Sequence, residues 1–228
     1  MNRFVLFFVL LLSSGCELPS IIQADQYVEP VPIEISSNIP DYENVWDRIK
    51  DASSMREENL DEKTLQYLNV YLSNPVQLDK LLEKGRYFIY FVLEELERYR
   101  LPPELALLPY IESNYDPFSI SASGAMGIWQ FMPATARIYG LKDTWWYEQR
   151  HDPLVSSKAA VRYLAYLHNR FNKEITYTLA AYNGGPTLLE KRIKLNKKAG
   201  KPTDYKNLKL SKQTQDYVPK FNAILAIV

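Results

Sequence analysis

Apolar side chains recur every three or four residues along most of this 228-residue chain, and that spacing limits its possible folds more than any other feature. Such intervals place apolar residues on one face of a helix. The clearest helical patterns from Asp41 onward span residues 45–49, 65–72, 75–101, 153–171 and 211–224. No segment alternates convincingly as a strand would, and the glycines gather mostly in two short segments. The sequence therefore predicts an all-α fold without internal repeats.

Charge and composition argue against several classes of protein. Lys and Arg number 27 and Asp and Glu also number 27, whereas nucleic-acid-binding domains are usually basic. Hydrophobic residues make up 46% of the chain, which is typical of a folded domain. Two His, one Cys and no HExxH or CxxC spacing predict neither a metal nor another cofactor. The 17 tyrosines fit either a Tyr-rich core or a groove for a polar ring such as a sugar.

The N-terminus has the pattern of an export signal. Arg3 precedes the apolar run Phe4–Leu12, and small residues follow that run. Nine apolar residues are too few to cross a bilayer, which takes about 20. We therefore expect residues 1–15 to be a signal peptide.

The sole cysteine directly follows this segment, and the arrangement resembles a bacterial lipoprotein signal. The resemblance implies that Cys16 becomes the lipidated first residue and anchors the chain to a membrane, on the periplasmic face of the cell envelope. Ser13 stands where the lipoprotein pattern favours Leu, so a plainly cleaved signal peptide is the alternative. Glu17 replaces the Asp that favours inner-membrane retention in enterobacteria, which points to the outer membrane.

Composition and periodicity suggest three further segments. Residues 16–40 contain four prolines and little periodicity, which predicts a tether that spans roughly 75 Å when fully extended. Residues 41–100 are expected to form a helical extension. Residues 101–228 are expected to form the domain that carries the chemistry.

Glu112 is the first candidate for that chemistry. It lies in the stretch 107–115, which is largely apolar and contains no basic residue. Apolar surroundings raise the pKa of a carboxyl group, so that it can hold a proton near neutral pH and act as a general acid. An exposed glutamate at the edge of a buried helix is the alternative.

Two glycine-containing segments interrupt the helical pattern. In residues 121–133, glycines that permit tight turns accompany the polar side chains of Ser121 and Gln130. In residues 181–186, a helix is predicted to end in a Gly-rich turn that bears Tyr182 and Asn183. Each segment alone is compatible with an ordinary turn.

Together these segments resemble the goose-lysozyme-like (SLT) lytic transglycosylases, most closely the membrane-bound lytic murein transglycosylase D type. The matching motifs are Glu112-Ser113, Gly-Ile-Trp-Gln-Phe-Met-Pro at 127–133, Ala-Tyr-Asn-Gly-Gly at 181–185 and Tyr-Val-Pro-Lys at 217–220. They occur in the same order as in that family. The resemblance extends from about residue 101 to the end and implies a lysozyme-like catalytic domain.

The resemblance also implies a role for each matching residue. Glu112 corresponds to the catalytic acid and base, and Tyr217 to the tyrosine that places the catalytic carboxyl. Substrate contacts are implied for Ser121, Gln130, Met132, Tyr182 and Asn183. Ser113 is expected to support helix geometry, and Trp129 to lie in the core. Gln213 departs from the pattern, because relatives usually have Glu there.

The implied reaction cleaves the β-1,4 bond between N-acetylmuramic acid and N-acetylglucosamine in peptidoglycan glycan strands and leaves a 1,6-anhydro end. It needs one carboxyl group. Asp116, a possible second acid, is expected in a turn because the residue before Pro117 avoids helical geometry. A muramidase that hydrolyses the same bond and a non-catalytic peptidoglycan-binding lipoprotein are the alternatives. Relatives often carry wall-binding repeats further along, and this sequence stops at Val228, which fits either their absence or a truncated sequence.

Overall fold

The computed structural model describes residues 31–32, 44–53 and 60–228. The expected signal peptide, the expected lipid-anchor residue Cys16 and most of the expected tether lie outside the described residues. In the described part of the chain, no helix combines the length and apolar character that a membrane span requires.

The described residues are helical, as the periodicity predicts. The elements are α1 (Val45–Ala52), α2 (Glu62–Leu72), α3 (Pro75–Gly85), α4 (Ile89–Arg98), η2 (Pro103–Leu107), α5 (Leu108–Ser113), α6 (Pro133–Ile138), η3 (Gln149–His151), α7 (Pro153–Arg170), α8 (Ile175–Gly184), α9 (Pro186–Lys198), η4 (Tyr205–Asn207) and α10 (Lys212–Ile227). Within these ranges, β-pairing is confined to isolated bridges. The predicted all-α class is confirmed.

Local capping explains why two of the predicted helices begin where they do. The Asp152 carboxylate accepts hydrogen bonds from the backbone N–H groups of Leu154 and Val155, at 2.9 and 3.0 Å, and Pro153 follows as the first residue of α7. At α10, the Ser211 hydroxyl accepts from the backbone N–H of Thr214 at 3.2 Å. Both starts agree with the sequence prediction.

The apolar pattern over residues 75–101 is divided between two helices, whereas the sequence predicts a single long one. The helix α3 ends at Gly85, and α4 begins at Ile89. Tyr110 lies against this break: its hydroxyl donates to the Leu82 carbonyl at 2.9 Å, and a Cβ at position 85 would stand 2.0 Å from the hydroxyl oxygen. A buried ring from a later element therefore occupies the space beside the end of α3.

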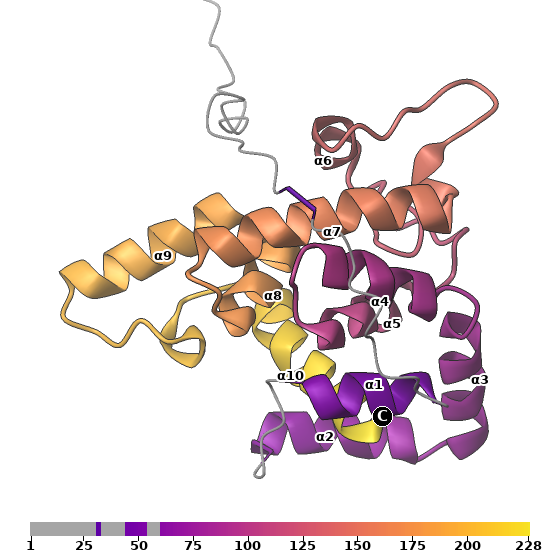
Figure 1. Ribbon diagram of the computed structural model, residues 1–228. Coiled ribbons are helices and arrows are strands. Elements are labelled where there is room, and N and C mark those ends of the chain that lie inside the picture. Colours follow the sequence, from indigo (N-terminus) through magenta and orange to yellow (C-terminus); the bar gives the residue numbers. More distant parts are fainter. Residues whose placement is uncertain (1–30, 33–43, 54–59) are drawn as a thin grey trace, which may run out of the picture.

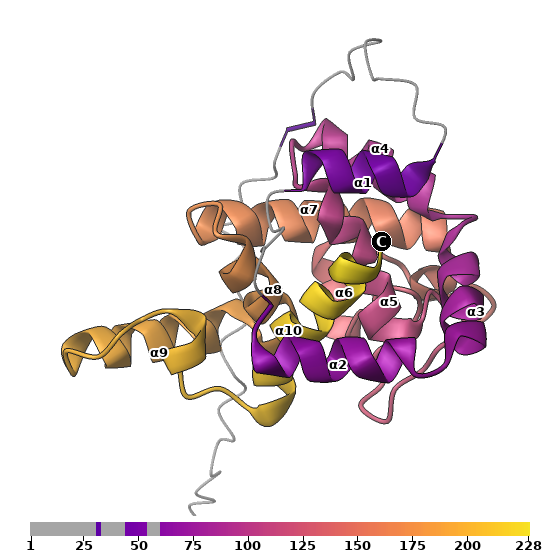
Figure 2. The same cartoon turned by 90° about the horizontal axis from the view of Figure 1, so that it is seen from below.

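One continuous core connects most of the described helices. The helix α10 packs against α2, α5 and α8, and α7 packs against α4 and α8 (Figures 1 and 2). In both views α9 reaches outward from this body. The buried apolar residues run from Val45 in α1 to Ile224 in α10 without separating into two clusters.

Polar contacts also join the expected extension to the expected catalytic domain. Asp216 of α10 pairs with Lys63 of α2, and with Lys212 at 2.6 Å. The Lys220 ammonium lies 5.3 Å from the centroid of the Tyr67 ring. The helix α2 is thus packed against α10, and the boundary between residues 100 and 101 stays a prediction.

Candidate active site

Glu112 lies on the short helix α5, which the surrounding core holds firmly. The side chains of Leu108 and Tyr110 on this helix are almost completely buried. The Ser113 hydroxyl donates to the Ile128 carbonyl at 3.0 Å, which ties α5 to the segment 127–133. Asn114 then takes a left-handed conformation, with φ of 55°, and ends the helix. Glu112 is therefore carried at the end of a helix that has little freedom to move.

The Glu112 carboxyl group is partly buried and accepts a hydrogen bond from a tyrosine of another helix. The Tyr217 hydroxyl, from α10, donates to Glu112 Oε1. Burial raises the pKa of Glu112 to about 7, and the hydrogen bond from Tyr217 acts in the opposite direction. Loss of hydration is thus the dominant influence on the pKa of Glu112, and the carboxyl group holds a proton near neutral pH.

Tyr182, on the last turn of α8, is the second tyrosine at the site. Burial first, and then the neighbouring Glu112 carboxylate, raise the pKa of both Tyr182 and Tyr217. The Tyr182 hydroxyl donates to the Trp129 carbonyl at 2.8 Å, and its ring centroid lies 5.4 Å from that of Tyr163. The structure therefore brings Glu112, Tyr182 and Tyr217 together from three helices.

Asn183 follows Tyr182 and connects two helices. Its side-chain oxygen accepts a hydrogen bond from the Thr214 hydroxyl at 3.0 Å, across the contact between α8 and α10. The helices approach closely at this point, because a Cβ at position 184 would lie 3.0 Å from the same hydroxyl. Asn183 thus helps position α10, which carries Tyr217.

Ser121, Gln130 and Met132 belong to the irregular segment that follows α5. The Gln130 amide donates to the carbonyls of Gly127 and Ser119, at 2.9 and 3.2 Å, and its backbone has a φ of 50°. The Ser121 hydroxyl accepts from the backbone N–H of Ala125 at 2.9 Å. Both side chains therefore stabilise the loop, whereas the Met132 side chain is exposed.

Trp129 and Asp116 have structural partners, whereas Gln213 lies at the surface. Trp129 is completely buried and donates from its indole nitrogen to the Ser157 hydroxyl at 2.8 Å, so it lies in the core as expected. Asp116 lies beyond the end of α5, where its carboxylate accepts from the backbone N–H of Phe118 at 2.9 Å. Gln213 is exposed on the first turn of α10.

Arg150 is a buried residue of this region that the sequence did not reveal. Its guanidinium forms two hydrogen bonds with Glu148, at 2.9 and 2.7 Å, and lowers the pKa of that carboxyl. It also donates to the carbonyls of Gly124 and Phe131, at 3.1 and 3.2 Å. Because these last two partners are backbone atoms, no pattern of residue types in the sequence predicts these hydrogen bonds. Arg150 fixes the segment that carries Gln130.

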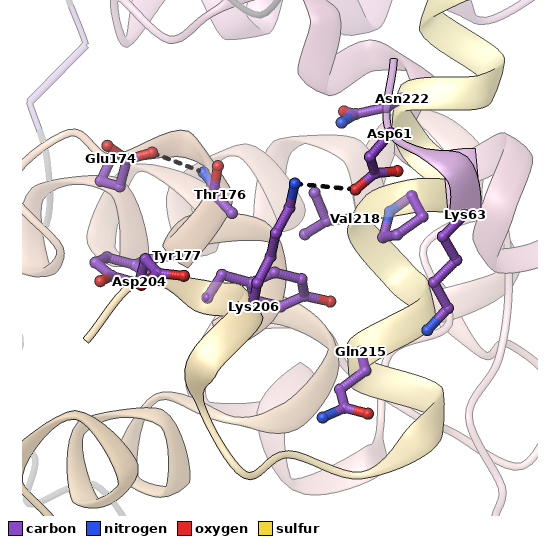
Figure 3. Close-up of a pocket in the computed structure, with 12 residues that line it drawn as sticks. Asp61, Lys63, Glu174, Thr176, Tyr177, Asp204, Lys206, Gln215, Val218 and Asn222 are labelled. Carbon is purple, nitrogen blue, oxygen red and sulfur yellow. Dashed lines mark hydrogen bonds and ion pairs between the residues drawn. The ribbon is translucent and has the colours of Figure 1, made fainter. Parts of the chain in front are cut away.

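The cavity in Figure 3 lies elsewhere on the molecule and contains none of the predicted site residues. It has a volume of about 570 Å³ and is bordered by the ends of α2 and α8 and by one face of α10. Lys206 within it pairs with Asp61 at 3.1 Å, and the Glu174 carboxylate accepts from the Thr176 backbone at 3.3 Å. Its two lysines are paired, Lys206 with Asp61 and Lys63 with Asp216, so the arrangement around Glu112 is the better candidate for catalysis.

Comparisons with known proteins identify the family of the chain. The family described as "Transglycosylase SLT domain" matches residues 90–204. Membrane-bound lytic murein transglycosylase D of Escherichia coli (strain K12) is 39% identical over 158 residues, which cover 69% of this chain and 35% of that protein. A putative tributyltin chloride resistance protein of Alteromonas sp. (strain M-1) is 38% identical over 98 residues, 43% of this chain and 47% of that protein.

Among solved structures, an inactive mutant of the lytic transglycosylase Slt from Pseudomonas aeruginosa aligns with a TM-score of 0.48 and 22% identity. The alignment covers 60% of this chain and 23% of that one. The chain spans about a third of the length of the E. coli relative.

Proposed function

Because this chain belongs to the transglycosylase SLT domain family, we propose that it is a peptidoglycan lytic transglycosylase. Its substrate is the β-1,4 bond between N-acetylmuramic acid and N-acetylglucosamine in glycan strands. The observation that carries the proposal is the partly buried Glu112 carboxyl, whose pKa is raised to about 7 and which accepts a hydrogen bond from Tyr217.

In the first step, protonated Glu112 donates its proton to the glycosidic oxygen as the bond to the anomeric carbon breaks. Positive charge develops on the sugar, and the substrate's own acetamido group relieves it. A carboxyl with a pKa near the working pH suits this task, because it is protonated often enough and still releases its proton readily. Such positioned acid catalysis contributes about 10²–10⁴-fold in rate.

In the second step, the Glu112 carboxylate takes the proton from the 6-hydroxyl of the same sugar, whose oxygen attacks the anomeric carbon. The product is a 1,6-anhydro sugar, Glu112 is protonated again, and no water is consumed. The Tyr217 hydroxyl stabilises the carboxylate between the two steps through its hydrogen bond. An intramolecular nucleophile gains from being held close to its target.

Three further acids, Asp143, Glu148 and Asp152, follow Glu112 in the chain, and their contacts favour a mechanism with one carboxyl group. Among the described residues, Glu148 pairs with Arg150 and Asp152 caps α7. Asp143 lies 3.7 Å from Arg137. Glu148 and Asp152 thus have close partners within the protein, and burial and Tyr217 account for the pKa of Glu112.

The remaining predicted site residues are proposed as further substrate contacts. Ser121, Gln130 and Met132 lie on or beside the loop that follows α5, and Tyr182 and Asn183 lie at the end of α8. Exposed Met132 offers an apolar contact for a sugar ring. We further propose that the chain is an outer-membrane lipoprotein anchored at Cys16 and facing the periplasm, which the N-terminal motif supports.

Digestion of purified peptidoglycan by the exported protein, followed by mass spectrometry of the soluble fragments, tests the reaction. Fragments lighter than hydrolysis products by one water and ending in 1,6-anhydro-N-acetylmuramic acid are expected. Glu112→Gln is expected to bind glycan strands and to lose at least about 10²-fold in rate. Tyr90→Ala, at an exposed position outside the site, serves as the matched control with normal rate.

Other outcomes point to other functions. Reducing ends in place of anhydro ends indicate a muramidase on the same scaffold. Binding to peptidoglycan without Glu112-dependent fragments indicates a non-catalytic wall-binding protein. Turnover by Glu112→Gln at the normal rate removes Glu112 from the mechanism.

A further inference from the structure

Aromatic side chains gather at one exposed hollow that the proposed catalytic residues do not line. The hollow, of about 680 Å³, is bordered by residues of the segment between α6 and α7, by the first turn of α7, and by Phe88 and Phe118. Trp145 is 88% exposed, Trp146 71% and Phe118 77%. Large exposed apolar patches of this kind mark interaction sites. We call Phe118, Trp145, Trp146 and Tyr147 the aromatic platform.

Hydrogen bonds hold the aromatic platform in a defined shape. Thr144 and Tyr147 close a tight turn, in which the Thr144 backbone N–H donates to the Tyr147 carbonyl at 2.9 Å. The Tyr147 hydroxyl donates to the Asp152 carboxylate at 2.7 Å. Trp145 and Trp146 stand at the tip of this turn, edge to face, with ring centroids 4.5 Å apart. A preformed surface loses little conformational freedom when a ligand binds.

The aromatic platform is also joined to the loop that carries the proposed substrate contacts. Figure 1 shows the connection between α6 and α7 projecting from the helical body. Arg150, at the base of this connection, donates to Gly124 and Phe131, which flank Gln130. On the other side, the His151 ring donates to the Pro117 carbonyl at 2.7 Å, beside Phe118. The platform and the Gln130 loop therefore form one continuous unit.

We infer that the aromatic platform binds sugar rings of the glycan strand beyond the bond that is cleaved. This inference rests on the proposed function and adds a distant subsite to it. One face of a pyranose ring consists of C–H groups and packs flat on an indole ring, while its hydroxyl groups remain in water. The mixture of exposed indoles and nearby polar groups on the platform matches such a ligand.

The charges around the hollow argue against an anionic lipid surface as the occupant. Its lining, as far as the chain is described, includes the carboxylates of Glu148 and Asp152 and no lysine or arginine. Surfaces that bind anionic membranes are rich in these two cations. In a glycan strand the lactyl carboxyl groups lie at one edge of the sugar ring, so the apolar ring faces can pack on the indoles while those groups point away from Glu148 and Asp152.

Binding measurements on the non-cleaving Glu112→Gln protein test this inference. The ligands are peptide-free glycan strands and a tetrasaccharide of the same sugars. Calorimetry measures the Kd of each. Adding Trp145→Ala and Trp146→Ala is expected to raise the Kd for long strands at least about tenfold, as for other Trp hot spots. The Kd for the tetrasaccharide is expected to change less than about twofold, because the inference assigns the platform to sugar rings beyond those of a short ligand at Glu112.

Two control variants separate stacking from general damage. Trp145→Phe with Trp146→Phe keeps aromatic faces and is expected to recover most of the long-strand affinity. Tyr90→Ala removes an exposed aromatic ring at a different hollow, which Trp46 lines, and is expected to change neither Kd. Circular dichroism of each variant confirms that it folds.

In the cleaving protein, the loss from the double Ala variant is expected in KM for long strands and not in kcat. Equal long-strand affinity in the parent and the double Ala variant overturns the inference. So does tryptophan-dependent binding to vesicles of phosphatidylethanolamine and phosphatidylglycerol without tryptophan-dependent binding to strands. Tryptophan-dependent strand binding in a protein that releases no anhydro fragments supports the inference and removes the proposed reaction, so the two fail separately.

Discussion

At the scale of single residues, the hydrogen bond from Tyr217 to Glu112 makes the pH range in which the protein is expected to be active depend on one hydroxyl group. The bond stabilises the ionised carboxyl and so lowers a pKa that burial has raised to about 7. The general-acid step needs the protonated carboxyl. Activity is therefore expected to decline as the pH rises through about 7.

Tyr217→Phe removes the hydroxyl and keeps the ring. The pKa of Glu112 is expected to rise further, so the alkaline limb of the pH profile of kcat/KM should move to higher pH. Tyr182→Phe is the matched control, since its hydroxyl donates to the Trp129 carbonyl and not to Glu112. Profiles measured between pH 5 and 9 check this, and identical limbs in the wild type and Tyr217→Phe would contradict it.

Glu112 also couples folding stability to pH. Its pKa is about 7 in the folded protein against 4.5 for the ordinary group, so the folded state holds the proton more tightly. The stabilisation is complete below pH 4.5, and it is lost as the pH rises toward 7 and beyond. The difference in pKa corresponds to between about 3 and 4 kcal/mol, because one pKa unit is about 1.4 kcal/mol.

Glu112→Gln is expected to abolish this part of the pH dependence. From pH 4.5 to pH 8, the free energy of unfolding should fall by up to about 3 kcal/mol more in the wild type than in the variant. Urea unfolding at both pH values measures the difference. A parallel fall in the two proteins would mean that Glu112 ionises normally in the folded state.

At the scale of elements, the loop after α5 depends on a close backbone contact at Gly127. This residue has a φ of 77°, and a Cβ there would lie 1.8 Å from the Arg150 carbonyl oxygen. Gly124 has a similar φ of 84° but has no atom within 4 Å of its Cβ position. Comparing Ala substitutions at these two glycines therefore separates the cost of backbone strain from the cost of the steric clash.

Gly127→Ala is expected to destabilise the protein by about 2–5 kcal/mol, as strain and overpacking add. Gly124→Ala, which suffers the strain alone, should cost about 1–2 kcal/mol. Chemical denaturation of both variants gives the two values. Equal losses would show that the Arg150 backbone moves aside without penalty.

The sequence predicts those helices whose first residues are set by neighbouring side chains. Asp152 and Pro153 fix the start of α7, and Ser211 fixes that of α10, so these helices were predicted closely. The break after Gly85 was missed, because the Tyr110 ring that lies there comes from 25 residues further along. Distant packing of this kind leaves no local pattern.

The candidate site follows the same rule. The apolar neighbours of Glu112 in the sequence correctly indicated a raised pKa. Its pairing with Tyr217 was expected from family resemblance alone, since nothing in the spacing of the two residues indicates it. Arg150 was missed because two of its partners are backbone carbonyls.

At the scale of the whole molecule, the helices before residue 101 share the core with those after it. Four residues of α4 are at most 2% exposed, namely Ile89, Val92, Leu93 and Leu96. Burial of four such side chains contributes about 6–12 kcal/mol, which is comparable to the entire stability of a typical domain. The predicted boundary at 100/101 therefore divides a core that is shared.

A fragment of residues 101–228 is expected to lack a cooperative unfolding transition. The fragment 44–228 retains α1 to α10 and serves as the folded control. Thermal unfolding followed by near-ultraviolet circular dichroism compares the two. A sharp transition in the shorter fragment would establish residues 101–228 as an independent domain.

The hydrogen bond from Tyr217 to Glu112 spans 105 positions in the chain, and this has a consequence for the timing of biosynthesis. Ribosomes make the segment with the carboxyl several seconds before the segment with its partner, at about 5–20 residues per second. Until α10 docks, Glu112 lacks the hydrogen bond from Tyr217 and the share of its burial that α10 contributes. The raised pKa of Glu112 therefore arises only with the finished fold.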